Sequence, residues 1–377
     1  MFCLGPKALA NGGKWFIIYP MSVVATSEGI PFRPLKEGMV EVARDVWRWW
    51  YWYPWRRLVQ ALPHPARLQV ARLLGTLFYL SSPSWRALTQ AELRASFQGR
   101  PASHSLARLS LWAAQQYYLG QLEVFTYPRL TPRDMEAYFP LEGQEYLDAA
   151  QASGRGVMVL LSHLGANQMI MPALGFRGYR VNQISRAAKA DNDEYQGRHL
   201  SPLFRKIINL QRAYEESLPA RHLDVSRGLR QVFRKLKANE LVALAGDGRY
   251  GMEWKPHTFL GRPATFSPGP WLIAHRTGAL LLPIFVLRPQ RGCKYRVIIE
   301  TPLSLPYGAD SETFLQAGLD AYVHRLETYF YRYPWQYAPF LYLARRYTRN
   351  RVNQFFQDYP ADCPAAGPSA AQSTGTS

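Results

Sequence analysis

The sequence predicts an α/β fold with a mostly parallel sheet flanked by helices, and a helical, aromatic-rich region in front of it. From about residue 135 onward, short apolar runs typical of buried strands alternate with segments of helical periodicity. Before that point, apolar residues recur at helical spacing. Strands that alternate with helices form parallel sheets, because each helix returns the chain to the edge where the preceding strand started.

The N-terminal region combines helical periodicity with many aromatic and basic side chains. Residues 1–40 show no clear pattern and are expected to form a poorly ordered extension. Residues 41–60 contain five tryptophans, two tyrosines and four arginines, and apolar spacing predicts helices over 65–79 and 106–126. Trp and Tyr favour the bilayer interface and Arg favours anionic headgroups. We therefore predict a helical membrane-interface region over 41–130, with an aromatic helix packed on the core as the alternative.

The next part of the chain, residues 131–350, is predicted to be one α/β domain. Residues 156–162, which read GVMVLLS, are typical of a buried parallel strand. Residues 224–237 predict a basic amphipathic helix with Asp224 as its N-cap. The other predicted strands span 179–185, 241–245, 280–287 and 295–300, and the other predicted helices span 166–174, 271–276 and 311–331. The end of the chain is rich in Ala, Pro, Ser, Gly and Thr, which predicts a disordered tail over 357–377.

Charge and cysteine content limit the classes of partner. The chain has 377 residues and a net charge of +18, from 45 basic and 27 acidic side chains. Such an excess indicates an anionic partner, which could be a membrane surface, a nucleic acid or an acidic carrier protein. Long Lys/Arg blocks and nucleic-acid-binding motifs are absent, so we expect no nucleic acid partner. Cys3, Cys293 and Cys363 lie far apart without a CxxC spacing, which predicts neither a disulfide framework nor a metal site.

No segment of the sequence forms a convincing membrane-spanning helix. The most apolar stretch, residues 279–287, has nine residues, whereas a helix that crosses a bilayer needs about 20. Gly12, Gly13 and Lys14 interrupt the apolar pattern that a signal peptide would need near the start of the chain. We therefore predict peripheral membrane attachment through the tryptophans at positions 47–55 and the arginines near them.

Polar side chains follow three of the predicted strands at the point where each strand ends. His163 follows the first strand, Arg186 follows the second, and Asp247 and Arg249 follow the third. In open parallel sheets, ligands bind outside the carboxyl ends of the strands. The histidine could remove a proton from a hydroxyl group, and the arginines could hold a phosphate by paired hydrogen bonds. A structural histidine and surface ion pairs are the alternative interpretation.

Several segments around these positions resemble the motifs of a known family. Residues 162–168 read SHLGANQ, residues 246–249 read GDGR and residues 259–264 read FLGRPA. They are followed by SPGP at 267–270, AHRTGA at 274–279 and PWQY at 334–337. In this order they resemble the lysophospholipid acyltransferase superfamily, and most closely its branch of bacterial lipid A late acyltransferases. The resemblance covers roughly residues 60–345, although the PWQY segment matches only loosely.

The resemblance implies a glycerolipid acyltransferase-like fold and a set of site residues. His163 would be the general base, and Asp247 and Gln168 would be further candidate catalytic residues. The residues that would bind substrate are Arg186, Gly248, Arg249, Gly261 and Pro263. No metal and no bound cofactor are expected, since the thioester of the acyl donor is already activated.

Gln168 departs from the superfamily pattern, which has Asp or Glu at this position. The acid orients the histidine and stabilises the imidazolium, whereas an amide carries no charge. In serine proteases the same exchange costs about 10⁴ in turnover. Three interpretations are open: another carboxylate has taken over, with Asp247, Asp191 and Glu194 as candidates; the enzyme is slow and relies on positioning and oxyanion stabilisation; or the chain is a catalytically degenerate lipid-binding or scaffold protein.

The activity that the resemblance implies is acyl transfer at the cytoplasmic face of the inner membrane. The donor would be a fatty acyl thioester of acyl carrier protein or coenzyme A. The acceptor would be a hydroxyl group of a phosphorylated lipid or glycolipid, of the lipid A or lysophospholipid type. Anionic lipids, the carrier protein and the acceptor phosphates would all complement the positive charge of the chain.

Overall fold

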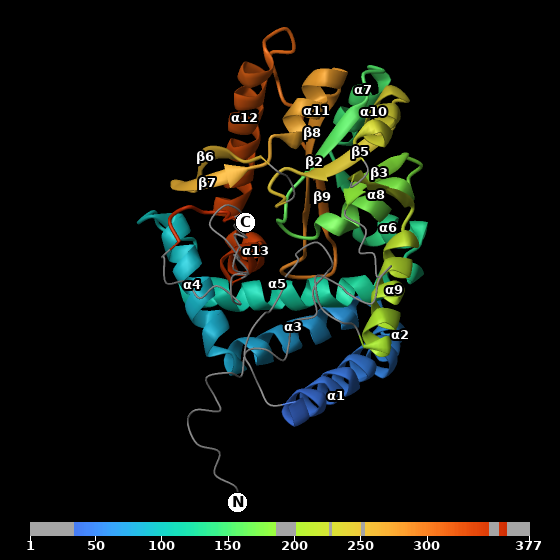
Figure 1. Cartoon of the computed structure of the whole chain (residues 1–377), viewed down its shortest axis with the longest axis vertical. Coiled ribbons are helices and arrows are strands. Elements are labelled where there is room, and N and C mark those ends of the chain that lie inside the picture. Colours follow the sequence, from blue (N-terminus) through green and yellow to red (C-terminus); the bar gives the residue numbers. More distant parts are fainter. Residues whose placement is uncertain (1–33, 186–200, 226–227, 250–252, 347–353, 360–377) are drawn as a thin grey trace, which may run out of the picture.

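The computed structural model describes residues 34–185, 201–225, 228–249, 253–346 and 354–359. Within these residues a seven-stranded sheet lies at the centre, and helices pack around it (Figure 1). The N-terminal helices lie below the sheet in this view, with α1 (Pro34–Trp50) farthest from it. The predicted α/β fold with a helical, aromatic-rich N-terminal region is therefore confirmed.

The chain is helical from α1 to the start of the sheet. After α1 come the π-helix η3 (Tyr51–Trp55), α2 (Arg56–Ala61), α3 (His64–Ser81), α4 (Pro83–Phe97), α5 (Leu106–Thr126), the 3-10 helix η4 (Tyr127–Arg129) and α6 (Pro132–Tyr138). α3 and α5 confirm the helices predicted over 65–79 and 106–126. Residues 34–40 belong to α1, so the expected N-terminal extension is wrong for that part, and residues 1–33 lie outside the described residues.

The central sheet is parallel except at one strand pair. Its order is β1-β9-β8-β2-β5-β3-β4, and among these neighbours only β8 and β9 run antiparallel. The strands are β1 (Leu141–Glu142), β2 (Val157–Leu161), β3 (Val181–Ser185), β4 (Ala220–Asp224), β5 (Leu241–Ala245), β8 (Leu280–Leu287) and β9 (Arg296–Ile299). Five of them, β2, β3, β5, β8 and β9, were predicted from their apolar runs.

The two faces of the sheet lie against two separate apolar cores. In β2 every residue is buried. Met158 and Leu160 belong to one core, and the other three residues belong to the other. Successive side chains of a strand point to opposite faces, so β2 is covered on both sides. This explains why its sequence reads as a continuous apolar run rather than an alternating one.

The helices of the α/β domain connect and cover these strands. They are α7 (Gln144–Ala152), the 3-10 helix η5 (Asn167–Met169), α8 (Ile170–Gly175), α9 (Pro202–Glu216), α10 (Arg230–Lys237), α11 (Gly269–Thr277), α12 (Ser311–Arg332) and α13 (Pro334–Arg346). The prediction of one helix over 224–237 is wrong at its start. Residue Asp224 ends β4 and is not an N-cap, and the helix begins six residues later at Arg230.

A two-stranded hairpin projects from the central sheet and was not predicted. It consists of β6 (Lys255–Phe259) and β7 (Arg262–Phe266), which pair antiparallel. Residues 354–359, called the strap below, lie along β7. The backbone N–H of Thr265 donates to Phe355, and that of Gln357 donates to Pro263.

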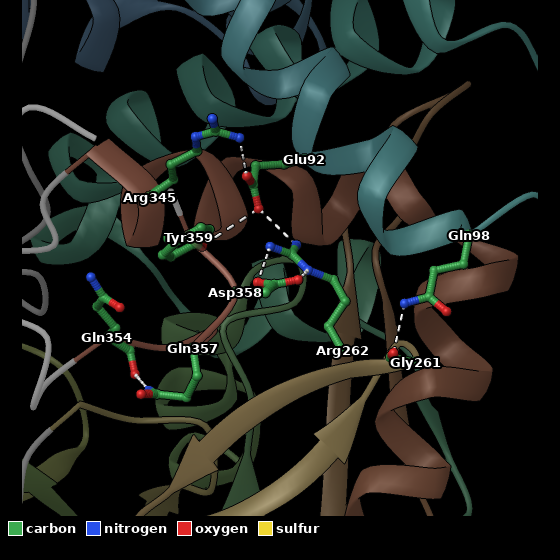
Figure 2. Close-up of polar contacts among 9 residues, drawn as sticks. All are labelled: Glu92, Gln98, Gly261, Arg262, Arg345, Gln354, Gln357, Asp358 and Tyr359. Atoms are coloured by element: carbon green, nitrogen blue, oxygen red, sulfur yellow. Dashed lines mark hydrogen bonds and ion pairs between the residues drawn. The ribbon is translucent and has the colours of Figure 1, made fainter. Parts of the chain in front are cut away.

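A charge cluster around the buried Arg262 and Glu92 fixes the strap and the hairpin to α4 (Figure 2). Arg262 donates to both carboxylate oxygens of Asp358 at 2.8 Å and to Glu92 on α4 at 3.0 Å. Arg345 of α13 donates to the other oxygen of Glu92 at 2.6 Å. Tyr359 packs beside them and is buried. The Arg262 and Glu92 side chains are 4% and 1% exposed, and removing one partner of such a buried pair typically costs about 3–5 kcal/mol. The predicted tail over 357–377 is therefore wrong for residues 357–359, and the rest of it lies outside the described residues.

Candidate active site

Two parallel strands bring His163 and Asp247 together at the carboxyl end of the sheet. β2 and β5 are neighbours, and their last residues, Leu161 and Ala245, are paired in register. His163 and Asp247 each lie two residues beyond those strand ends. Because neighbouring parallel strands end at the same edge, this register places the two side chains next to each other. The prediction that they share one rim of the sheet is confirmed.

The contact between them defines the chemistry available to the histidine. His163 Nδ1 lies 2.8 Å from Asp247 Oδ1, and the backbone N–H of His163 donates to Oδ2 at 2.8 Å. The Asp247 side chain is fully buried, and that of His163 is 15% exposed. Since a carboxylate accepts hydrogen bonds, Nδ1 carries the hydrogen and Nε2 carries the lone pair. His163 can therefore take a proton through Nε2 while Asp247 stabilises the resulting imidazolium.

The loop after β2 is held by backbone contacts on both sides. Gly165 has a φ of 69°, and a Cβ at this position would overlap the carbonyl oxygen of Val286 on β8. Its N–H donates to the carbonyl of Gln336 on α13 at 3.1 Å, and the N–H of Ala166 donates to Val286 at 2.7 Å. The loop that carries His163 thus runs between the end of β8 and the start of α13, and only glycine fits at position 165.

A buried ion pair supports the same loop. Arg288, the residue after β8, donates to both carboxylate oxygens of Glu123 on α5 at 2.7 and 2.6 Å. It also donates to the carbonyl of Gly165 at 2.6 Å, and the Tyr295 hydroxyl donates to Glu123 at 2.8 Å. Buried charges persist when they are paired and hydrogen-bonded in this way. This pair was not predicted from the sequence, because its members are 165 positions apart and neither lies in a motif.

Two residues of α13 contact the His163–Asp247 pair and were also missed. The Tyr337 hydroxyl donates to Asp247 Oδ2 at 3.0 Å. Burial raises the pKa of Tyr337 well above its usual value, and the Asp247 carboxylate raises it further, so the phenol keeps its proton. The Phe340 ring stacks on the His163 ring, with 4.6 Å between centroids and 15° between planes. The only sequence signal for this helix was the loose PWQY resemblance at 334–337.

Gln168 does not take the place of the missing acid through a contact with the histidine. It lies in η5, and its Oε1 accepts a hydrogen bond from Gln183 Nε2 on β3 at 3.3 Å. Among the described residues, the partner of the His163 ring is Asp247. Two of the alternative acids, Asp191 and Glu194, lie outside the described residues, as does the predicted substrate-binding residue Arg186.

Arg249 lies near Asp247, but its guanidinium already binds protein groups. Its two terminal nitrogens donate to the carbonyl of Thr265 at 2.6 Å and the carbonyl of Gln354 at 2.8 Å. The guanidinium also stacks on Trp254, 3.8 Å from the ring centroid. Burial lowers the pKa of Arg249 to about 10. These contacts join the strand-end loop to β7 and the strap, so a phosphate would have to compete with them, and the predicted phosphate contact stays a prediction.

The other predicted binding residues have local structural reasons to be present. Gly248 lies in a tight turn whose N–H donates to Ala245. Gly261 forms the β6–β7 turn with a φ of 70°, and its carbonyl accepts a hydrogen bond at 2.6 Å from Gln98, the residue after α4 (Figure 2). Pro263 accepts the strap hydrogen bond described above. Their substrate contacts stay a prediction.

Comparison with known proteins connects this geometry to a family. The sequence model of the bacterial lipid A biosynthesis acyltransferases matches residues 39–341. Two curated relatives, both described as phosphatidylinositol mannoside acyltransferase from Mycobacterium tuberculosis (strains CDC 1551 / Oshkosh and ATCC 25618 / H37Rv), are 28% identical over 181 residues. The matched region covers 46% of this chain and 53% of each relative, so the chain spans about half the length of the curated relatives it matches.

Proposed function

Because this chain belongs to the bacterial lipid A biosynthesis acyltransferase family, we propose that it transfers a fatty acyl group from a thioester donor to a hydroxyl group of a lipid. The observation that carries the proposal is the 2.8 Å contact between His163 Nδ1 and the buried Asp247 carboxylate at the carboxyl end of the sheet. A histidine held in this way is a general base whose positive charge is stabilised as it forms.

The proposed reaction proceeds by direct attack of the acceptor. His163 Nε2 removes the proton of the acceptor hydroxyl, and the oxygen attacks the thioester carbonyl. A carbon–oxygen ester bond forms, the carbon–sulfur bond breaks, and the proton passes from His163 to the leaving thiolate. The histidine therefore returns to its neutral state, and no further reactant is needed.

The proposed substrates follow from charge and from the family. The acceptor is a phosphorylated lipid or glycolipid of the lipid A or lysophospholipid type, and the donor is an acyl thioester of acyl carrier protein or coenzyme A. The net charge of +18 complements each of these anionic groups. We place the reaction at the cytoplasmic face of the inner membrane. The alternative of a degenerate lipid-binding protein was based on Gln168, and the Asp247 contact weakens that argument.

Comparison of total lipids with and without this gene tests the proposed function. Mass spectrometry should find one lipid class that loses a single acyl chain when the gene is deleted. The purified protein should restore that species when it is mixed with the deacylated lipid and an acyl thioester. A lipid profile that does not change on deletion, together with no transfer in vitro, would contradict the proposal.

Two exposed apolar helix faces support attachment to a membrane surface. The exposed apolar residues of α1 are Val42, Val46, Trp49 and Trp50, and those of α3 are Leu73, Leu77 and Leu80. Their spacing of three or four positions places each set on one side of its helix. Within the described residues no helix is long and apolar enough to cross a membrane. The predicted tryptophan cluster contains both surface and core residues. Trp49 and Trp50 are exposed, whereas Trp52 is buried against Phe125 of α5.

Combined substitution of Trp49→Ser and Leu77→Ser should weaken binding to vesicles that contain anionic lipid. Complete burial of a large apolar side chain contributes about 1.5–3 kcal/mol. Each of these two side chains would be only partly buried in the membrane, so losing both should weaken vesicle binding by at least about tenfold. Co-sedimentation of the purified protein with vesicles measures the change. Tyr146→Ser with Leu229→Ser is the matched control. These exposed residues lie on α7 and at the start of α10, and both helices are far from α1 and α3 (Figure 1). An equal loss in both double variants would contradict attachment through α1 and α3.

A further inference from the structure

The start of α13 contacts every part of the candidate catalytic pair. Tyr337 binds the Asp247 carboxylate, Phe340 stacks on the His163 ring, and the carbonyl of Gln336 holds the loop at Gly165. Residues three positions apart lie on the same side of a helix, so Tyr337 and Phe340 face the pair together. We propose that Tyr337 and Phe340 are positioning residues for His163 and Asp247, and that the strap holds Phe340 in place. This inference rests on the proposed acyl transfer.

Tyr337 is the hydrogen-bond donor that neutralises part of the Asp247 charge. Among the described residues, four ionisable groups face Asp247: His163 after β2, Tyr337 of α13, Tyr322 of α12 and Arg249 in the loop after β5. The Tyr322 hydroxyl donates to the carbonyl of Leu161 at 2.8 Å, and the terminal nitrogens of Arg249 donate to carbonyls elsewhere. Among the described side chains, Tyr337 and His163 thus share the carboxylate, and the strength of one hydrogen bond depends on the other.

The Phe340 ring is itself in contact with the strap. Phe355 of the strap packs edge-on against Phe340, with 5.2 Å between centroids and 82° between planes. Phe355 is almost fully buried. The strap cannot shift easily, because Asp358 binds the buried Arg262 and Tyr359 contacts the buried Glu92 (Figure 2). A continuous series of packed rings therefore joins the charge cluster to the imidazole.

Tyr337→Phe removes the hydroxyl and keeps the ring. We expect kcat to fall about tenfold, the usual effect of losing one hydrogen bond to a charged group, while KM changes little. The acid limb of the pH profile of kcat/KM should move to higher pH by about 0.5 to 1, because Asp247 without its second donor holds a proton on His163 more strongly. If Tyr337 were only structural, the substitution would lower thermal stability and leave the acid limb of the pH profile unchanged.

Nuclear magnetic resonance of the whole protein with ¹³C-labelled histidine separates this inference from the proposed function. The His163 signal is assigned by its loss in His163→Ala, and its titration midpoint should move to higher pH in Tyr337→Phe, whether or not transfer is detected. Tyr307→Phe is the control. Its hydroxyl donates to the carbonyl of Ala279 at 2.8 Å. Ala279 precedes β8, so this contact lies at the amino end of that strand, whereas the candidate site lies at its carboxyl end. An unchanged midpoint in Tyr337→Phe would overturn the role of Tyr337.

Phe340→Leu tests the stacking without changing any charge. The leucine fills similar volume but offers no flat surface to the imidazole, so we expect kcat to fall severalfold with no shift of the acid limb. This variant also covers the case in which Tyr337→Phe does not fold. Unchanged kcat in a folded Phe340→Leu protein would overturn the role of Phe340, and a shifted limb would show that the ring acts through charge instead of position.

Discussion

His163→Ala should lower acyl transfer by about 10³-fold or more while the fold remains intact. A positioned general base contributes about 10²–10⁴ in rate, and in the proposed mechanism this histidine also returns the proton to the leaving thiolate. The side chain lies at a strand end with part of its surface exposed. Its removal therefore deletes chemistry and little packing. Transfer from acyl thioester to purified lipid acceptor, at saturating concentrations of both, measures the effect.

His275→Ala is the control for that experiment. His275 lies on α11 and contacts the carbonyl of Ala309 at 3.0 Å, away from the strand-end contacts of His163. It should lose some stability and keep most of the activity. Equal melting temperatures of His163→Ala and the unmodified protein would establish that the loss is chemical. If His163→Ala transferred the acyl group as fast as the unmodified protein, this result would contradict the proposed mechanism.

The elements that the sequence predicted correctly are those with a strong periodic pattern. β2 and β8 are buried on both faces, so their apolar runs stand out, and α5 carries apolar residues over its whole length. β4, which reads ARHLD, lies at the edge of the sheet and has polar residues between its apolar ones. This strand was not predicted, and its last residue, Asp224, was predicted to be the N-cap of the basic helix that follows.

The hairpin was missed for a different physical reason. Each of its strands contains a proline, Pro256 in β6 and Pro263 in β7. Proline removes a backbone donor and normally argues against a strand in the interior of a sheet. In the hairpin Pro263 contributes its carbonyl, which accepts the N–H of Gln357 from the strap, so this contact needs no donor from the proline. The hairpin is then stabilised by Arg262, whose partners come from α4 and the strap and could not be read from the local sequence.

The central pair of the site was predictable because it depends only on strand ends. His163 and Asp247 follow apolar runs, and parallel neighbours bring such positions together. Tyr337 and Phe340 lie on α13, Glu123 lies on α5 and Arg288 follows β8, so their partners are at large sequence separation. Their contacts depend on how α5 and α13 pack on the sheet, and no residue pattern along the chain records that packing.

Asp247→Asn should be nearly as damaging as His163→Ala. The amide has the size of the carboxylate and can still accept hydrogen bonds, so the loop should keep its shape. It cannot balance the positive charge on His163, and in serine proteases this exchange costs about 10⁴ in turnover. Asp320→Asn is a matched control. It removes the carboxylate of a second His–Asp contact, 2.7 Å from His257 Nε2, whose carboxylate is mostly exposed. The transfer assay should show a large loss only for Asp247→Asn.

Gln168→Glu, measured beside Asp247→Asn, decides which position supplies the acid. Gln168 binds Gln183 and not the His163 ring, so a carboxylate there should bring no gain. It should slow the reaction modestly if it lies close enough to Asp247 for the two charges to repel. The opposite result, faster transfer by Gln168→Glu together with little loss in Asp247→Asn, would mean that the position usually acidic in the superfamily still serves the histidine. In that case the 2.8 Å contact between His163 and Asp247 would be structural. The unmodified enzyme would then be slow because position 168 carries no charge.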